Sequence, residues 1–243
     1  MKNEEFSEGP KVEVRRTADG SATLYVPALD EHYHSTHGAR QESEHVFIQA
    51  GLAPLLDAGL GQPCRRPLRL LEVGLGTGLN ALLTLRTARH AGAAVAYDGY
   101  ETRPLPAAVV AALAPDWAAQ SEALGQGFAA LHAAPWGQVH PLAPAFFLTK
   151  LHEPLQEAAL PAAYYDLIYF DAFAPEKQPE LWAEAIFAQL SAAAAPGAVL
   201  VSYCAQGQFR RHLRAAGWRV EKRPGPPGKR EMTRAVKDES VIA

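Results

Sequence analysis

Two kinds of hydrophobic pattern alternate along the chain, and together they predict its elements. Four short apolar runs have the length and composition of buried strands: 68–73, 95–100, 167–170 and 198–203. Other segments carry apolar residues at helical spacing: 78–91, 107–113, 117–131, 180–190 and 208–216. Strands that alternate with helices predict an α/β fold, a doubly wound and mostly parallel sheet covered by helices.

The N-terminal part has a different pattern. Two alternating segments, Lys11–Arg15 and Ala22–Val26, flank the favoured tight-turn pair Asp19-Gly20 and predict a β-hairpin. A polar loop follows, and a helix is predicted from Gln41 onward. We therefore expect an N-terminal hairpin that precedes the alternating core.

The remaining strands lie in weaker patterns. Residues 138–155 are ambiguous and should contain a third core strand with its turn. Two short strands are predicted at 218–221 and 231–236, with residues 224–229 connecting them. This ending predicts an antiparallel pair of strands at one edge of the sheet.

A glycine-rich turn follows the first core strand and opens the first core helix. Its pattern is Glu72-x-Gly74-x-Gly76-x-Gly78, whereas a dinucleotide fingerprint would require glycine at Leu79. Glycines let a ligand approach the backbone, and the helix start offers free N–H groups to polar atoms. The spacing is similar to motif I of class I S-adenosylmethionine-dependent methyltransferases, although a glycine-rich turn without a ligand has the same local pattern.

Acidic residues stand where two core strands end. Glu101 follows the second core strand, a position that commonly binds ribose hydroxyls, although an exposed loop acid remains an alternative. Asp171 stands at the carboxyl end of the strand at 167–170, where open α/β sheets place their chemistry. Asp166 lies at the opposite end of that strand, so we expect a structural role for it.

Length and composition indicate a globular protein. With 243 residues, 48% apolar residues and a mean hydropathy of −0.12, the chain can bury a sizeable core. We divide it into a hairpin and helix extension, residues 1–60, packed on a core domain, residues 61–243. No apolar run approaches the roughly 18 residues of a membrane span. The acidic start has no signal-peptide core, and Cys64 and Cys204 form no framework, so we expect a cytoplasmic protein.

Charge is distributed unevenly along the chain. The net charge is −3, but residues 205–243 contain ten basic and four acidic residues. A basic C-terminal part on an acidic body indicates a localised anionic partner, and a solvated helix face explains it equally well.

Three histidines, His32, His34 and His37, raise the question of a metal. Their spacing fits no standard zinc motif and no cysteine lies nearby, so we expect no metal site. A loop that covers an active site, or a plain surface loop, fits these residues better.

Several separate stretches resemble one methyltransferase family. They are Glu31-His-Tyr-His-Ser, Gln41-Glu-Ser-Glu-His-Val-Phe-Ile, Gly74-Leu-Gly-Thr-Gly-Leu-Asn, Tyr100-Glu101, Asp166-Leu-Ile-Tyr-Phe-Asp-Ala-Phe-Ala-Pro with Pro179-Glu-Leu-Trp, Tyr203-Cys-Ala-Gln-Gly with Arg210-Arg-His-Leu-Arg-Ala-Ala-Gly, and Gly228-Lys-Arg-Glu-Met. In this order they resemble the methyltransferase domain of the bifunctional tRNA wobble-uridine enzyme MnmC and its stand-alone relatives. The resemblance implies a class I methyltransferase fold with a mostly parallel, seven-stranded sheet.

The resemblance also implies an activity, namely methyl transfer from S-adenosyl-L-methionine to the amine of 5-aminomethyl-(2-thio)uridine in the tRNA anticodon loop. The residues expected to bind the cofactor are Glu72, Gly74, Gly76, Thr77, Gly78, Asn80, Glu101 and Asp171. Asp171 would also orient the amine and could act as the base. The candidates for substrate binding are Phe173, Tyr203, Arg210, Arg211, Lys229 and Arg230. The two aromatic residues could stack on the uracil or line the methionine pocket, but core packing suits them equally well. The four basic residues could contact phosphates.

The chain departs from that family in two respects. No second glycine fingerprint for the FAD-dependent oxidase half follows, so we expect another enzyme or route to supply the aminomethyl intermediate. An acidic residue after the third strand, facing the adenine, is not evident near Lys150. The alternatives are an aminopropyltransferase or other small-amine methyltransferase of the same fold, and a non-catalytic module that binds tRNA or S-adenosylmethionine. Cys204 is interpreted as a packing residue.

Overall fold

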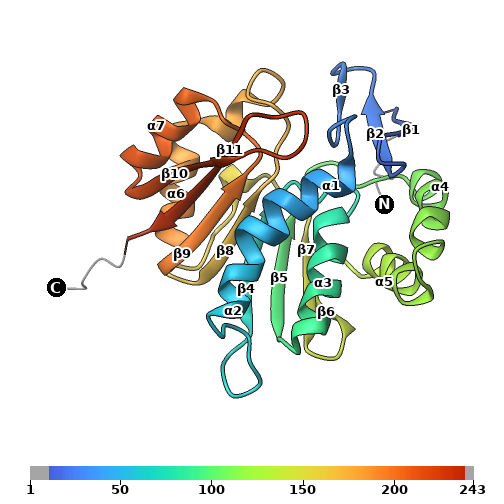
Figure 1. The fold of residues 1–243 in the computed structure, drawn as a ribbon, viewed down its shortest axis with the longest axis horizontal. Coiled ribbons are helices and arrows are strands. Elements are labelled where there is room, and N and C mark those ends of the chain that lie inside the picture. Colours follow the sequence, from blue (N-terminus) through green and yellow to red (C-terminus); the bar gives the residue numbers. More distant parts are fainter. Residues whose placement is uncertain (1–10, 239–243) are drawn as a thin grey trace, which may run out of the picture.

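The computed structural model describes residues 11–238, so the acidic start of the chain lies outside the described residues. Within that range, eight strands form one sheet with the order β10-β11-β9-β8-β4-β5-β7-β6 (Figure 1). Its parallel strands are β4 (Leu68–Val73), β5 (Val95–Tyr100), β7 (Phe146–Leu151), β8 (Tyr165–Phe170) and β9 (Ala194–Ser202). The expected α/β architecture is therefore confirmed.

The two edges of this sheet are antiparallel. Strand β11 (Glu231–Lys237) lies between β9 and β10 (Trp218–Pro224) and runs antiparallel to both, as the sequence predicts. At the other edge, β6 (Val139–Ala143) pairs with β7 and adds an eighth strand to the seven that were expected. The ambiguous segment thus holds two strands joined by a tight turn, in which Ala145 has a φ of 63°.

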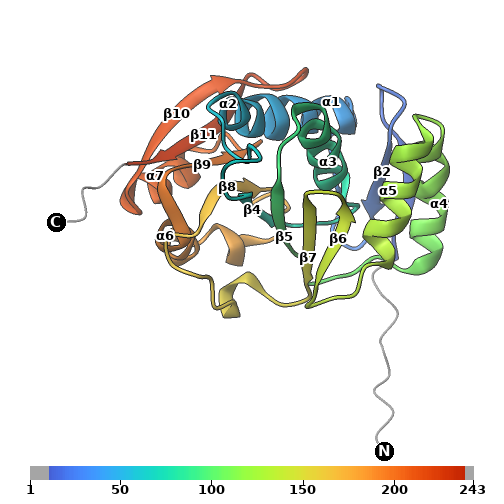
Figure 2. The ribbon, with the colours of Figure 1, turned by 90° about the horizontal axis from the view of Figure 1, so that it is seen from below.

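Helices cover both faces of the sheet (Figure 2). The helices on one face are α1 (Ala39–Ser43), η1 (Glu44–Leu52), α2 (Ala53–Asp57), α3 (Leu79–Ala91) and α5 (Glu122–Ala133), with α4 (Ala107–Ala118) packed on α5. The other face carries η2 (Leu155–Glu157), η3 (Pro179–Trp182), α6 (Glu184–Ala193) and α7 (Gly207–Ala215). Strand β8 is buried along its whole length because its side chains alternate between these two layers.

The helix expected at 180–190 is divided into η3 and α6, and the boundary between α4 and α5 also differs from the expectation. Helix α4 continues through Pro115 to Ala118, although a break before Trp117 was expected. Pro115 has no N–H to donate to the carbonyl group of Ala111, four residues earlier. Ala111 is exposed, so the helix tolerates the loss of this hydrogen bond. The break falls instead at Ser121, whose hydroxyl accepts a hydrogen bond from the Leu124 N–H and caps α5.

The N-terminal extension is a small three-stranded sheet followed by a helix. Strands β1 (Glu13–Arg16), β2 (Ala22–Val26) and β3 (Glu31–His32) pair in that order, which confirms the hairpin. The helix from α1 to α2 packs on α3 and on strands β8, β9 and β11, and its middle section η1 is π-helical. Whether residues 1–60 form a separate unit stays a prediction.

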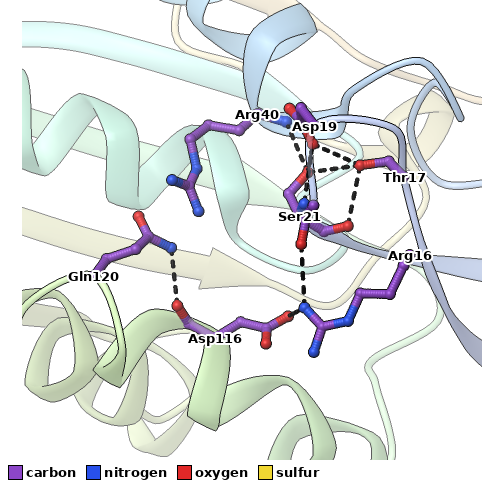
Figure 3. Close-up of polar contacts among 8 residues, drawn as sticks. Arg16, Thr17, Asp19, Ser21, Arg40, Asp116 and Gln120 are labelled. Atoms are coloured by element: carbon purple, nitrogen blue, oxygen red, sulfur yellow. Dashed lines mark hydrogen bonds and ion pairs between the residues drawn. The ribbon is translucent and has the colours of Figure 1, made fainter.

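One aspartate fastens the hairpin turn (Figure 3). Asp19 accepts hydrogen bonds from the hydroxyl of Thr17 at 2.6 Å, from the hydroxyl and N–H of Ser21, and from the N–H of Gln41 at the start of α1. Burial opposes its ionisation, but these donors together lower the pKa of Asp19 to about 2. The turn is thereby tied to the helix that follows it.

Candidate functional site

A cavity of about 290 Å³ lies at the carboxyl ends of β4, β5 and β8. Parallel α/β sheets bind ligands at this edge, where the loops after the strands converge. Among the expected site residues, those that line the cavity are Gly74, Gly76, Asn80, Glu101, Asp171 and Phe173. The sequence thus identifies the residues of three separate loops that meet at one place.

The glycine turn after β4 forms one wall of the cavity. Gly74 has a φ of +89°, and a Cβ atom there would lie 2.7 Å from the carbonyl oxygen of Asp171. Gly78 has a φ of +75° and is the N-cap of α3. Both conformations are strained for side-chain-bearing residues, and Gly74 permits the close approach of the turn to the end of β8.

Glu101 lies where β5 ends. One carboxylate oxygen accepts the Gly76 N–H at 2.9 Å, and the other accepts the Arg103 N–H at 2.8 Å. Burial raises the pKa of Glu101, and these backbone donors act in the opposite direction. Each oxygen retains a free lone pair, so the carboxylate can still accept from a pair of ligand hydroxyls.

Asp171 follows β8, on the opposite side of the glycine turn. Its backbone N–H donates to the Val73 carbonyl, and its Oδ2 accepts from Asn80 Nδ2 at 2.8 Å. Burial raises the pKa of Asp171 to about 7, with the Asn80 hydrogen bond opposing the shift. Glu72 does not line the cavity: it is fully buried behind Asn80, and burial raises its pKa well above the usual range.

Two aromatic rings line the same cavity as Asp171. Phe173 and Tyr33 form an edge-to-face pair with ring centroids 5.1 Å apart. Tyr33 also lies against the glycine turn, since a Cβ on Gly76 would be 3.0 Å from its ring. Trp182 holds the Phe173 backbone in place by donating its indole N–H to the carbonyl oxygen at 2.8 Å. The loop after β3 therefore covers part of the cavity, which is one of the two roles expected for it.

His34 follows Tyr33 in this loop and also lines the cavity. Burial lowers the pKa of its imidazole to about 4, so the ring is neutral at pH 7. Within residues 11–238, no group of three or more His, Cys, Asp or Glu side chains is arranged to hold a metal ion.

Tyr203 and Lys229 lie beside the cavity rather than in its wall. Tyr203 donates its hydroxyl to the carbonyl oxygen of Ala172 at 2.8 Å, and the Lys229 ammonium lies 4.3 Å from the centre of its ring. Lys229 also forms an ion pair with Glu42, which accepts the Ser35 N–H as well. These contacts join the turn between β10 and β11 to α1, and the two segments lie side by side in both views (Figures 1 and 2).

The three arginines expected to contact phosphates are in different environments. Arg210 is buried, and its three guanidinium nitrogens donate to Thr233, Glu231 and the Met232 carbonyl oxygen, so it is not available to a phosphate. Arg211 is exposed on α7 and donates to Gln208, outside the cavity wall. Arg230 is exposed in the turn between β10 and β11.

Three other residues singled out in the sequence lie behind the site. Thr77 is buried outside the cavity wall, and its carbonyl oxygen is 3.2 Å from His132 Nε2. Gly78 shapes the turn, but a Cβ there would meet Leu131, so it faces the protein interior. Cys204 is packed in the core, and burial raises the pKa of its thiol.

The structure adds residues that the pattern did not reveal. Those that line the cavity include Tyr33, His34, Arg103, Glu153, Lys177 and Gln178. Glu153 lies two residues beyond the end of β7 and is the acid that was missed after the third strand. The sequence did not reveal Glu153 because it did not show where β7 ends. Without that strand end, no acid could be assigned to the position just after it.

The cavity suits a nucleoside that carries a charged methionine-like chain. Glu101 offers acceptors for a ribose diol, and the glycine turn brings the backbone within reach of a ligand. Asn80 Oδ1 is buried and has no hydrogen-bond partner among residues 11–238, which leaves an acceptor close to the turn. The donor and acceptor set therefore fits S-adenosyl-L-methionine.

Comparison with known proteins agrees with this geometry. Residues 147–238 match the model of a family described as S-adenosyl-L-methionine-dependent methyltransferase. The tRNA 5-methylaminomethyl-2-thiouridine biosynthesis bifunctional protein MnmC of Magnetococcus marinus is 36% identical over 227 residues, 88% of this chain and 32% of that protein. MnmC of Ralstonia nicotianae is 35% identical over 226 residues, again 88% of this chain and 33% of that protein. The chain thus spans about a third of the length of these relatives.

A solved structure extends the similarity to the fold. The crystal structure of MnmC2 from Aquifex aeolicus superposes with a TM-score of 0.74 and 23% sequence identity, covering 96% of this chain and 72% of that chain. Within residues 11–238, no helix has the length and apolarity required to cross a membrane. The chain is an S-adenosyl-L-methionine-dependent methyltransferase domain that is similar to MnmC over 88% of its length and shares the fold of MnmC2.

Proposed function

We propose that the chain methylates the primary amine of 5-aminomethyl-(2-thio)uridine at the wobble position of tRNA, giving 5-methylaminomethyl-(2-thio)uridine. The observation that carries this proposal is the position of Asp171. Its side chain lines the same cavity as the glycine turn and the Tyr33–Phe173 aromatic pair, and its Oδ2 is already bonded to Asn80. A hydrogen-bond acceptor next to aromatic faces suits an amine attached to an unstacked base.

The reaction depends on a neutral amine held in line with the transferable methyl group. When bound, S-adenosyl-L-methionine supplies an electrophilic methyl group on a sulfonium ion. A nitrogen–carbon bond forms as the sulfur–carbon bond breaks, and the amine nitrogen must then lose a proton. Positive charge moves from sulfur to nitrogen, so orientation is the main requirement and contributes up to about 7–11 kcal/mol.

Asp171 performs two tasks in this proposal. As a carboxylate it accepts a hydrogen bond from the amine and directs the nitrogen lone pair away from itself, toward the methyl group. After transfer it accepts the proton, and its pKa of about 7 allows it to return that proton to water. Below this pKa the carboxyl group is protonated and cannot take up the proton of the amine. The rate of methyl transfer should therefore rise as the pH increases through about 7.

The aromatic pair and nearby cations would hold the nucleotide. Phe173 presents a face for the uracil, and Tyr33 covers the glycine turn next to it. Arg103 and Lys177 line the cavity from two different loops, and Arg230 is exposed on a third. Cations in these positions suit the phosphates that flank an unstacked base. They replace Arg210 as candidates for contacting the RNA backbone.

The curated relatives are bifunctional by name, and this chain matches about a third of their length. We propose that a separate active site, of the kind that removes a carboxymethyl group, supplies the aminomethyl nucleoside. Both reactions would take place in the cytoplasm, where the free thiols Cys64 and Cys204 remain reduced.

The test is mass analysis of nucleosides from tRNA that carries 5-aminomethyl-2-thiouridine, incubated with the protein and S-adenosyl-L-methionine. The wild type should add one methyl group, and Asp171→Asn should lower the rate by about 10²–10⁴-fold. Asp166→Asn is the matched control, because Asp166 lies at the other end of β8 and pairs with Arg66 at 2.6 Å. It should retain methyl transfer. No methyl gain by a wild type that binds S-adenosylhomocysteine would refute the proposed substrate.

A further inference from the structure

A continuous chain of hydrogen bonds runs from the middle of the sheet to Asp171. Tyr97 donates its hydroxyl to Glu72 Oε2 at 2.7 Å. Asn80 Nδ2 donates to Glu72 Oε1 at 2.9 Å and to Asp171 Oδ2 at 2.8 Å. One amide group therefore bridges two carboxyl groups, one inside the protein and one in the cavity wall.

Burial determines what these residues can touch. Tyr97 and Glu72 are 0% exposed, and Asn80 is 2% exposed. A side chain with no exposed surface cannot contact a ligand, so Glu72 acts only through its protein neighbours. The Asn80 amide has two hydrogens, and the two carboxyl groups accept both of them. It has no donor left for a bound molecule.

Each member of the chain stands on a different rigid element. Tyr97 is on β5, Glu72 on β4, Asn80 in the first turn of α3, and Asp171 directly after β8. The three strands are neighbours in one parallel ladder, in which Leu70 pairs with both Tyr97 and Leu167. The strand register therefore fixes the distances along the chain, and the position of the Asp171 carboxylate with them.

We propose that Tyr97, Glu72 and Asn80 are positioning residues that hold the Asp171 carboxylate in the orientation needed for the incoming amine. This inference rests on the proposed function, because it takes Asp171 as the group that receives the amine. It assigns to Glu72 a different role from the cofactor binding expected from its place in the glycine motif, and it adds a positioning role for the amide group of Asn80. Oδ2 is restrained by Asn80, and Oδ1 is left for the substrate.

Removing the Asn80 donor should also change the ionisation of Asp171. A hydrogen bond to the anion favours the charged form, so its loss raises the pKa of Asp171 further. The charged and titratable groups around this carboxyl group are Glu42 on α1, Lys229 in the turn between β10 and β11, Tyr203 after β9, Glu72 on β4 and Tyr97 on β5. All five are retained in an Asn80 variant, so the shift reports the lost donor.

The experiment compares Tyr97→Phe and Asn80→Ala with the control Tyr169→Phe. Tyr169 is equally buried on the neighbouring strand, but its hydroxyl lies 3.2 Å from Thr84 Oγ1 and is not part of the chain. Initial rates are measured with the aminomethyl nucleoside in tRNA, and S-adenosylhomocysteine binding is measured by calorimetry. The two chain variants should lower kcat by about 10- to 100-fold, as a small misplacement of a catalytic group does. Tyr97→Phe should change cofactor affinity less than about twofold, because Tyr97 does not line the cavity, and Tyr169→Phe should retain the wild-type kcat.

A double-mutant cycle excludes a merely structural effect. In the Asp171→Asn background, Tyr97→Phe should have no further effect on kcat, because the chain acts only through the Asp171 carboxylate. The acid limb of the pH profile of Asn80→Ala should move to higher pH. Equal losses from Tyr97→Phe in both backgrounds would overturn the proposal, as would a main effect on cofactor affinity.

A second measurement separates this inference from the proposed function. If the wild type does not methylate the aminomethyl nucleoside, the proposed function fails, whatever the variants do. The chain is then tested by carbon-13 NMR titration of the labelled Asp171 carboxyl group, assigned with Asp171→Asn. A higher pKa in Asn80→Ala than in the wild type supports the chain, and an unchanged pKa overturns it.

Discussion

Replacing Gly74 by alanine tests whether the glycine turn has to approach Asp171 closely. Gly74 has a φ of +89°, a conformation that costs an alanine about 1–2 kcal/mol. The new Cβ would also lie 2.7 Å from the Asp171 carbonyl oxygen, and such overpacking typically costs about 1–3 kcal/mol more. The turn must therefore separate from β8, which displaces both the cofactor wall and the carboxylate next to it.

Gly92 provides the matched control for this experiment. It has a similar φ of +63°, at the end of α3, but a Cβ there meets nothing within 4 Å. Gly92→Ala should therefore show the conformational cost alone, about 1–2 kcal/mol. For a chain of this size that is a decrease in Tm of roughly 2–8 °C.

Two assays separate the contributions. Urea unfolding gives the stability of both variants, and calorimetry gives their affinity for S-adenosylhomocysteine. Gly92→Ala should bind like the wild type, whereas Gly74→Ala should lose at least about tenfold in affinity, equivalent to 1.4 kcal/mol. If Gly74→Ala were no less stable than Gly92→Ala and bound equally well, the close approach of the turn would not be needed for the site.

Three further predictions concern residues around the site. Asp19 has a pKa of about 2 in the fold and an unperturbed value of 3.8, so its stabilisation is present above pH 3.8 and is lost as the pH falls toward 2. This stabilisation should amount to no more than about 1 kcal/mol after allowance for solvent screening. In urea unfolding between pH 2 and pH 4, Asp19→Asn should abolish the pH dependence that Asp19 contributes. Lys229→Met leaves Glu42, which is 7% exposed, without its cation and should cost about 1–3 kcal/mol of stability in thermal unfolding. Adding Glu42→Gln should restore part of this stability, and purely additive losses would contradict the coupling between Lys229 and Glu42. Arg210→Met should destabilise by about 3 kcal/mol, whereas Arg211→Ala should stay within about 0.5 kcal/mol, and equal losses would contradict their different environments.

Local pattern was sufficient for most of the fold. The strand at 95–100 follows from its short apolar run, and the helix at 78–91 follows from apolar periodicity and from the glycine turn that opens it, because these constraints act within one element. The failures have local causes too. Two strands joined at Ala145 looked like one ambiguous segment, and Pro115 suggested a break that the exposed side of α4 does not need.

The candidate site was predictable only in part. Glu101 and Asp171 were found because an acid at the carboxyl end of a parallel strand faces the ligand edge of the sheet. Glu72 is also an acidic residue and lies in the most recognisable motif, yet it is buried behind the cavity wall. A motif reports the type of residue and its spacing, but it does not report which neighbour the side chain faces.

By itself, the sequence determined the alternation of strands and helices, the sharp turn at Gly74 and the acids that follow the strands. These depend on backbone conformation and on the burial of one face of each element, which neighbouring residues specify. Only the tertiary structure decided that Asn80 bridges Glu72 and Asp171, which is 91 residues away from it, and that Tyr33 covers the glycine turn. Such contacts depend on strand order, register and the paths of loops, because these bring distant parts of the chain together.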